Sequence, residues 1–208
     1  MLNVALTGNI AAGKSSVCEL FRRWGATIID ADQLTREVEA PGSPVLGAIV
    51  ARFGPGVVRS DGTLDRAGLR AIVLADPGAR RDLEAMVHPA VEARRAALVE
   101  AARRRGDRIV ISDIPLLFEA GKPEGFDAVV LVDAPVELRL ARLMRDRGWD
   151  ETEARRMLAA QGSAEAKRGW RGGPALAAPF IIENAGDRAE LEAQAARVWA
   201  ALLVRAPA

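Results

Sequence analysis

The chain has a single cysteine, Cys18, and a single histidine, His88. One thiol cannot form an internal disulfide, so a disulfide-stapled fold is excluded and a reducing compartment is expected. Cys18 falls in a helical pattern, where a packed core thiol is more probable than a reactive one. A lone histidine is more often a hydrogen-bonded structural residue than a catalyst, which leaves His88 at most a substrate-side role.

Long apolar runs and an excess of one charge are also missing. No run approaches the length that spans a bilayer, and no charged-then-apolar leader opens the chain. We therefore expect a cytoplasmic protein without membrane contact. The 29 basic and 28 acidic residues give a net charge of +1. That balance argues against a nucleic-acid partner, because duplex-binding proteins carry a basic stripe.

Lysine is scarce, with three residues against 26 arginines, and one of the three lies in a motif. Residues 8–15, GNIAAGKS, fit the phosphate-binding pattern G-x-x-x-x-G-K-[ST]. An apolar run, 2–6, leads into the motif and a helical pattern, 16–24, leads out, which is the strand, loop and helix order that aims N–H groups at phosphate. The alternative is a glycine-rich turn that contains Lys-Ser by chance. The motif predicts a nucleotide site made by Gly8, Ala11, Ala12, Gly13, Lys14, Ser15 and Ser16.

Five short apolar runs predict buried strands, and the helical patterns between them predict crossover connections and a parallel sheet. The runs are 2–6, 27–29, 108–112, 128–132 and 180–182. In open α/β sheets, ligands bind outside the carboxyl edge of the strands. Four of the runs lead to a polar residue at that edge: Asp30, Asp113, Asp133 and Asn184.

Two helical insertions separate the strands. The first, 32–106, is longer than one crossover needs and is predicted to be a helical acceptor domain. The second, 136–175, is predicted to be a mobile lid, with a helix that carries Arg139, Arg142 and Arg145 on one side and a flexible turn at 169–174. The alternative is that these three arginines form an ordinary solvent-exposed helix face. The nucleotide-binding core then comprises 1–31, 107–135 and 176–208.

Kinase chemistry needs groups around the phosphates and a group at the acceptor. Lys14 is predicted to neutralise the transferring phosphate, and the Ser15 hydroxyl to hold Mg²⁺, with Asp113 as a second metal ligand through water. Asp32 can orient an acceptor hydroxyl and take its proton. It is an equally good N-cap for the next helix. A GTPase is disfavoured, because Asn-Lys-x-Asp is missing and the plausible Asp-x-x-Gly, Asp65 to Gly68, lies in helical sequence.

A series of short motifs resembles the dephospho-coenzyme A (dephospho-CoA) kinase family over nearly the whole chain. The motifs are Leu6-Thr7-Gly8, Asp30-Ala31-Asp32, Asp61-Gly62 with Leu64-Asp65-Arg66 and Leu69, His88-Pro89, Ile114-Pro115-Leu116-Leu117-Phe118-Glu119, Arg142-Leu143, Ala159-Ala160-Gln161 and Asn184-Ala185-Gly186. Asn9 and Ala11 depart from the family's usual glycines, and Asp146 stands where a second lid arginine is usual.

The resemblance implies an α/β fold of the P-loop nucleoside-monophosphate-kinase type, a five-stranded parallel sheet flanked by helices with a helical substrate domain and a lid. It implies transfer of the ATP γ-phosphate to the ribose 3′-hydroxyl of dephospho-CoA, the last step of coenzyme A synthesis. Asp32 is then the base and Arg142 a catalytic lid arginine, with Asn184 and Gly186 near adenine. The acceptor site is assigned to Asp32, Arg66, His88, Pro89, Leu117, Phe118 and Glu119.

Two other functions remain open at this point. One is a P-loop kinase that acts on another small hydroxyl substrate, such as a nucleoside or a sugar acid. The other is a non-catalytic nucleotide switch, for which slow hydrolysis without stimulation by an acceptor is expected. The sequence leaves the oligomeric state open.

Overall fold

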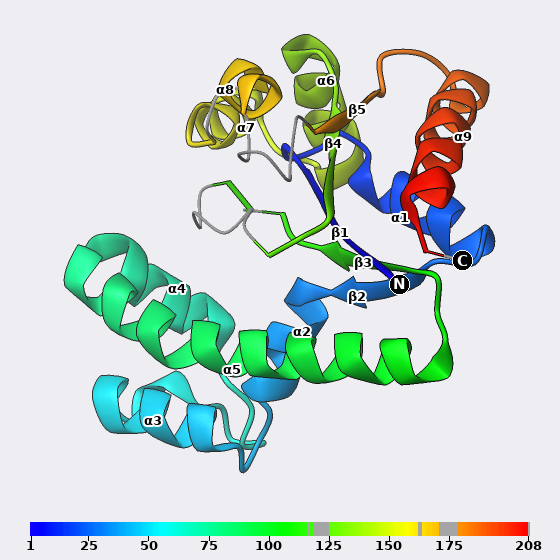
Figure 1. Cartoon of the computed structure of the whole chain (residues 1–208). Helices are drawn as coiled ribbons and strands as arrows, with labels where there is room; N and C mark the ends of the chain where they lie inside the picture. The colour runs from blue at the N-terminus through cyan, green and yellow to red at the C-terminus, as the bar shows by residue number, and fades with distance from the viewer. Residues whose placement is uncertain (116, 119–124, 162–163, 171–178, 208) are drawn as a thin grey trace. The chain divides into compact units, whose positions relative to one another are not determined.

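The computed structural model (Figure 1) describes residues 1–115, 117–118, 125–161, 164–170 and 179–207. The chain divides into two compact units. The sheet unit comprises Met1–Ile29 and Ala101–Ala208, and the helical unit comprises Asp30–Glu100. This division falls within a long helix at Glu100, six residues before the domain boundary expected at 106, and it leaves the predicted lid, 136–175, inside the sheet unit.

A five-stranded parallel sheet with the strand order β2-β3-β1-β4-β5 forms the centre of the sheet unit. Its strands are β1 (Leu2–Gly8), β2 (Thr27–Asp30), β3 (Ile109–Asp113), β4 (Ala128–Asp133) and β5 (Phe180–Glu183). In the register, Leu6 pairs with Asp113 of β3, and Gly8 pairs with Val132 of β4. The five predicted strands are confirmed, and their carboxyl ends meet at one edge.

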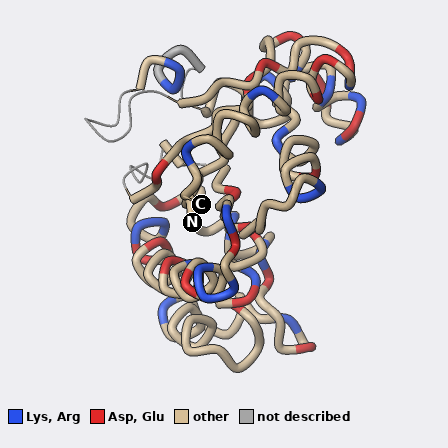
Figure 2. Tube along the Cα trace, turned by 45° about the vertical axis from the view of Figure 1, so that its right-hand side comes forward, with Lys and Arg blue, Asp and Glu red and all other residues tan. Residues whose placement is uncertain are grey.

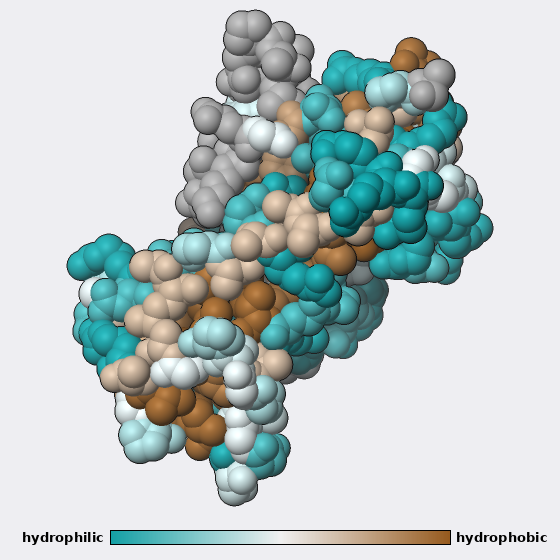
Figure 3. Space-filling view, turned by 60° about the horizontal axis from the view of Figure 1, so that its bottom comes forward, coloured by the Kyte–Doolittle hydropathy of each residue, from teal (hydrophilic) through white to brown (hydrophobic). Residues whose placement is uncertain are grey.

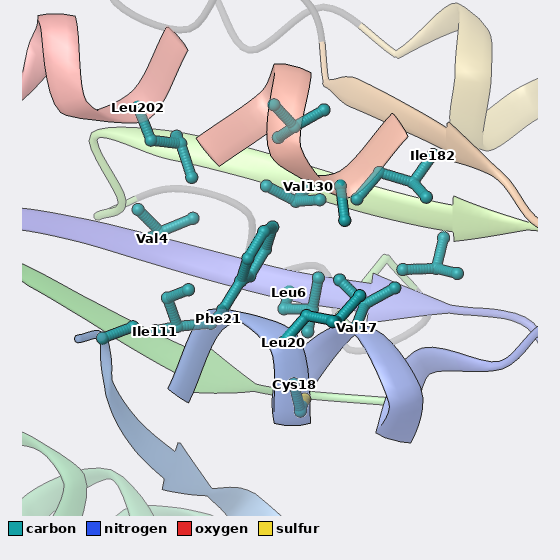
Figure 4. Close-up of a cluster of buried hydrophobic side chains, with 14 of the residues drawn as sticks. Val4, Leu6, Val17, Cys18, Leu20, Phe21, Ile111, Val130, Ile182 and Leu202 are labelled. Atoms are coloured by element: carbon teal, nitrogen blue, oxygen red, sulfur yellow. The ribbon is translucent and has the colours of Figure 1, made fainter. Parts of the chain in front are cut away.

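The two faces of the sheet bury alternate residues, because successive side chains of a strand point to opposite sides. On one face, Val4 and Leu6 of β1 pack with Phe21 of α1 (Lys14–Arg23) and Leu202 of α9 (Arg188–Arg205), as Figure 4 shows. On the other face, Ala5 packs with Leu117, Phe126 and Val129. The buried residues of α9 follow the helical period: Leu191, Ala195, Val198 and Leu202.

Three further helices follow β4 in the sheet unit. They are α6 (Val136–Arg147), α7 (Glu151–Ala159) and α8 (Ala164–Gly169). Gly148, in the left-handed region at φ 67°, ends α6. Leu140 and Leu143 of α6 pack with Ala154 of α7, and Ile10 and Ala11 of the phosphate loop cover this cluster. The predicted flexible turn at 169–174 lies largely outside the described residues, and α8 was not predicted.

The helical unit has a core of its own. It contains α2 (Ala31–Val38), α3 (Pro44–Phe53), the 3₁₀ turn η1 (Pro55–Val57), α4 (Arg66–Ala75) and most of α5 (Pro77–Arg105). The Ser43 hydroxyl caps α3 by accepting from the Leu46 N–H at 3.1 Å, and Pro44 begins the helix. The core residues are Leu46, Ile49, Val57, Leu64, Leu69 and Val87.

The helical unit carries an apolar surface region and a hollow. Figure 3 shows hydrophobic side chains gathered on one face of the helical unit. This unit also has an open hollow of about 640 Å³, lined by Gly42, Ser43, Leu46, Gly47, Val50, Pro55, Val58 and Arg59. Basic and acidic residues are interspersed along the described trace (Figure 2). Within that trace, no helix is both long enough and apolar enough to span a bilayer.

Candidate active site

The phosphate-loop motif forms the turn between β1 and α1. Gly8 must be a glycine, because a Cβ there would lie 2.5 Å from the Val132 carbonyl oxygen of the neighbouring strand. Gly13 adopts a left-handed φ of 93° and precedes the first helical residue. Ala11 has a φ of 59° and is the one non-glycine with positive φ among the described residues. The loop therefore takes a glycine-like conformation at a residue where alanine stores strain.

The first turn of α1 is open to an anion. Its N-cap residue, Gly13, has no side chain that could accept from the first N–H groups, and the turn contains no acidic residue. Such a helix end presents N–H groups and the positive end of the helix dipole. Ser15 and Ser16 lie exposed in this turn. The geometry suits a phosphate group.

Lys14 is ion-paired with Asp113, the last residue of β3. The other carboxylate oxygen of Asp113 accepts from the Cys18 thiol, with Sγ 3.3 Å from Oδ2. Burial raises the pKa of Cys18, and the Asp113 carboxylate raises it further. The thiol is therefore protonated at neutral pH and acts as a donor, and the prediction of a packed core thiol is confirmed by its 5% exposure.

Two residues from distant parts of the chain hold the loop backbone. Asn184, just after β5, donates from Nδ2 to the Ala12 carbonyl oxygen at 2.9 Å. Arg142 of α6 donates to the Ala11 carbonyl oxygen and to the Asn184 carbonyl oxygen, each at 3.2 Å. Burial lowers the pKa of Arg142, and Arg145 lowers it further. The structure thus brings both predicted residues to the loop.

The other arginines of α6 are engaged elsewhere. Arg139 is 4% exposed and donates from Nε to the Ala134 carbonyl oxygen at 3.1 Å. Arg145 pairs with Asp146 at 2.6 Å, and Arg147 lies over the Trp149 ring at 5.4 Å. Arg142 is therefore the α6 arginine that contacts the phosphate loop in this structure.

Two loop contacts were missed from the sequence. Lys167 of α8 donates from Nζ to the Asn9 Oδ1 at 2.7 Å. Gln161, which follows α7, accepts from the Ile10 N–H at 2.7 Å. The signal for Lys167 was its rarity, since lysine occurs only three times in the chain. Gln161 was part of a recognised motif and was given no role.

The predicted acceptor residues of the helical unit lie on three of its helices. Asp30 caps α2, accepting from the N–H groups of Asp32 at 2.9 Å and Gln33 at 3.1 Å. The alternative in which Asp32 is the N-cap is therefore wrong, because the extended backbone of Asp30 puts its own carboxylate over those donors. Asp32 is exposed in the first turn. His88 is exposed within α5, where Pro89 follows it.

Arg66 and the residues after β3 complete the predicted acceptor set. Arg66 is ion-paired with Glu39, which is 5% exposed. Leu117 is fully buried in the core, and Phe118 meets the Trp170 ring edge-on with centroids 5.6 Å apart. Glu119 lies outside the described residues. The roles of all these side chains stay predictions.

Comparison with known proteins identifies the family. A family model described as dephospho-CoA kinase matches residues 2–190. A dephospho-CoA kinase of Streptomyces avermitilis is 46% identical over 206 residues, covering 99% of this chain and 96% of that protein. One of Symbiobacterium thermophilum is 45% identical over 198 residues, covering 95% and 80%.

The fold has relatives among solved structures. The crystal structure of TT1252 from Thermus thermophilus matches with a TM-score of 0.78 at 33% identity, covering 96% of each chain. The predictions of a P-loop kinase fold and of a kinase rather than a nucleotide switch are confirmed by these matches. The chain belongs to the dephospho-CoA kinase family and is an ATP-dependent kinase.

Proposed function

We propose that the protein transfers the γ-phosphate of ATP to the ribose 3′-hydroxyl of dephospho-CoA, giving coenzyme A. The observation that carries the proposal is the phosphate loop, whose backbone carbonyl oxygens accept hydrogen bonds from Asn184 and Arg142. The chain that contains this loop belongs to the dephospho-CoA kinase family. The acceptor follows from the names of the relatives, which are dephospho-CoA kinases. A cytoplasmic location agrees with the single thiol.

The nucleotide side of the reaction is assigned to the loop and its neighbours. The backbone of Gly8 and of residues 11–16 receives the phosphates, and Lys14 exchanges Asp113 for phosphate oxygens when the nucleotide arrives. Arg142 contributes a second positive charge beside the loop. Asn184 and Gly186, which follow β5, border the adenine. This arrangement supports catalysis mainly by positioning and charge neutralisation.

The donors near Lys14 suit Mg²⁺. The exposed Ser15 hydroxyl lies in the first turn of α1, and the Asp113 carboxylate lies beside Lys14. Hydroxyl, carboxylate and phosphate oxygens are the ligands that Mg²⁺ prefers. We assign Ser15 as a direct ligand and Asp113 as a ligand through water. When bound, the ion would neutralise charge on the transferring phosphate.

The acceptor side is assigned to Asp32, with Arg66, His88, Pro89, Leu117, Phe118 and Glu119 lining the site. In the transfer, the ribose oxygen bonds to the γ-phosphorus, the bond to the β,γ-bridging oxygen breaks, and ADP leaves. Asp32 accepts the hydroxyl proton. Residues 32–106 form the acceptor domain, and residues 136–175 form the lid over the phosphates.

An acceptor panel tests the function. Radiolabelled ATP is offered with dephospho-CoA, with a nucleoside and with a sugar acid, and the labelled products are separated. We expect label in coenzyme A and at least a hundredfold lower rate with the other acceptors. Label in a nucleoside or sugar acid instead, or hydrolysis that no acceptor stimulates, would contradict the proposal.

A further inference from the structure

Helix α8 brings two consecutive cations, Lys167 and Arg168, to the carboxyl edge of the sheet. Lys167 is only 3% exposed. Burial of an ammonium group is costly unless acceptors are built around it. The position of Lys167 is therefore specified by its surroundings, unlike that of a lysine on an exposed helix surface.

The ammonium of Lys167 contacts the first turn of the phosphate loop. Nζ lies 2.7 Å from Oδ1 of Asn9, which is itself 3% exposed. The Asn9 carbonyl oxygen accepts from the Ala12 N–H at 3.1 Å, and this hydrogen bond closes the turn. An ammonium has donors only, so it also decides which end of the Asn9 amide faces it. Lys167 thus fixes the side chain of Asn9, the residue whose carbonyl oxygen closes the turn.

The helix that carries Lys167 is itself anchored. Arg168 donates from Nε to Oδ2 of Asp133 at 2.9 Å and from Nη1 to Oε1 of Glu183 at 2.6 Å. These acceptors end β4 and β5, so α8 is tied to two strand ends. Gln161 adds a bond to the next loop residue, the Ile10 N–H. Gln161 and Lys167 therefore contact the loop at two adjacent residues, Ile10 and Asn9.

We propose that Lys167 is a positioning residue for the phosphate loop. Through Asn9 it keeps the loop backbone in the conformation that receives the triphosphate, so the docking of α8 and the shape of the loop are coupled. The proposal rests on the proposed function only in taking ATP as the ligand of the loop. Lys167 acts through Asn9 and is not assigned a contact with the reacting atoms.

Replacement of Lys167 by methionine removes the ammonium and keeps a long apolar stem. For Lys167→Met we expect the Kd for ATP, measured without acceptor, to rise about tenfold, as for loss of a charge-assisted hydrogen bond. The KM for dephospho-CoA should be unchanged. Asn9→Ala should have the same effect. The double variant should bind ATP no more weakly than the weaker of the two single variants, because each substitution removes the same Lys167–Asn9 bond.

Arg197→Met is the matched control. It also removes a long cation, but from an exposed position of α9, and it should bind ATP as the wild type does. Wild-type ATP affinity in Lys167→Met would overturn the proposal. So would additive effects in the double variant, or an equal loss for both substrates together with a lower melting temperature, which is what a purely structural role predicts.

Two further outcomes are distinguishable. If Lys167→Met does not fold, Asn9→Ala decides alone, and unchanged ATP affinity in that variant overturns the proposal. A wild-type protein that binds ATP but does not phosphorylate dephospho-CoA would contradict the proposed function. That result would leave the positioning role of Lys167 to be judged on ATP affinity.

Discussion

Asn184 closes over the backbone of Gly13. Its Nδ2 donates to the Ala12 carbonyl oxygen at 2.9 Å, and a Cβ at Gly13 would lie 2.0 Å from the same nitrogen. The N-cap residue of α1, Gly13, must therefore lack a side chain for two reasons. Its φ of 93° is left-handed, and the Asn184 amide covers it. The end of β5 and the phosphate loop are built to fit each other.

Gly13→Ala should weaken nucleotide binding severely. The alanine would pay about 1–2 kcal/mol for the left-handed conformation and about 1–3 kcal/mol for displacing Asn184. We expect the Kd for ATP to rise at least tenfold, measured by calorimetry. Gly47→Ala is the control, because a Cβ there meets nothing within 4 Å and the residue lies within α3. Equal affinity in Gly13→Ala would show that the loop tolerates a side chain there.

Lys14→Ala should lower turnover by about 10²–10³-fold, the loss typical when one charged group that stabilises the transition state is removed. The side chain is 16% exposed and its ion-pair partner keeps the Cys18 thiol as a donor. The variant should still fold, with a lower melting temperature, because the Asp113 carboxylate is 13% exposed and loses its cation. Steady-state kinetics and a thermal melt check both expectations. Turnover close to that of the wild type would remove Lys14 from the mechanism.

Asp113→Asn separates two roles of this carboxylate, since Asp113 pairs with Lys14 and is also assigned as a metal ligand. An amide of the same shape is a poorer ligand for Mg²⁺. We expect the Mg²⁺ concentration for half-maximal rate to rise several-fold. Mg²⁺ dependence like that of the wild type, with a changed Kd for ATP, would mean that Asp113 positions Lys14 and does not bind the metal.

Asp32→Asn should depress turnover by about 10²–10⁴-fold, the range for removal of a general base. The Kd for ATP should stay within about twofold, and α2 should stay intact because Asp30 provides its cap. Glu19→Gln, a matched change on the exposed side of α1, should keep turnover. Loss of ATP binding in Asp32→Asn, with turnover per bound ATP preserved, would point to a structural or metal-related role instead.

Glu39 should make stability depend on pH. Burial raises its pKa, and the ion pair with Arg66 opposes that shift only in part. The folded state then holds the proton more tightly than the unfolded state, so stability falls as pH rises from about 4.3 through the folded pKa. We expect the melting temperature of the wild type, relative to Glu39→Gln, to decrease over that range. A difference that is flat with pH would contradict the raised pKa.

The strands and most helices were predictable because each carries its own local signal. The runs that became β1 and β4 are almost wholly apolar, as strands buried on both faces must be. Helix α3 carries a clear local start signal, since Ser43 is its N-cap and Pro44 its first residue. Helix α8 was missed because its six residues are too short for a periodic pattern.

Local sequence could not decide between neighbours with the same chemistry. Asp30 and Asp32 both stand at a strand-to-helix junction and both can cap a helix. The structure gives the cap to Asp30, whose φ of −90° and ψ of 112° are extended. Among the α6 arginines, spacing alone could not show that Arg142 contacts the loop and that Arg139 turns to the Ala134 carbonyl oxygen.

By itself the sequence determined the phosphate-loop motif, the parallel sheet and the kinase family, because these follow from contiguous residues whose order and spacing are visible along the chain. Only the tertiary structure decided which distant side chains hold that loop: Asp113, Arg142, Gln161, Lys167 and Asn184. The physical reason is that such contacts depend on the register of the strands and the direction of the helices that bring separate segments together, and no short window of sequence contains either.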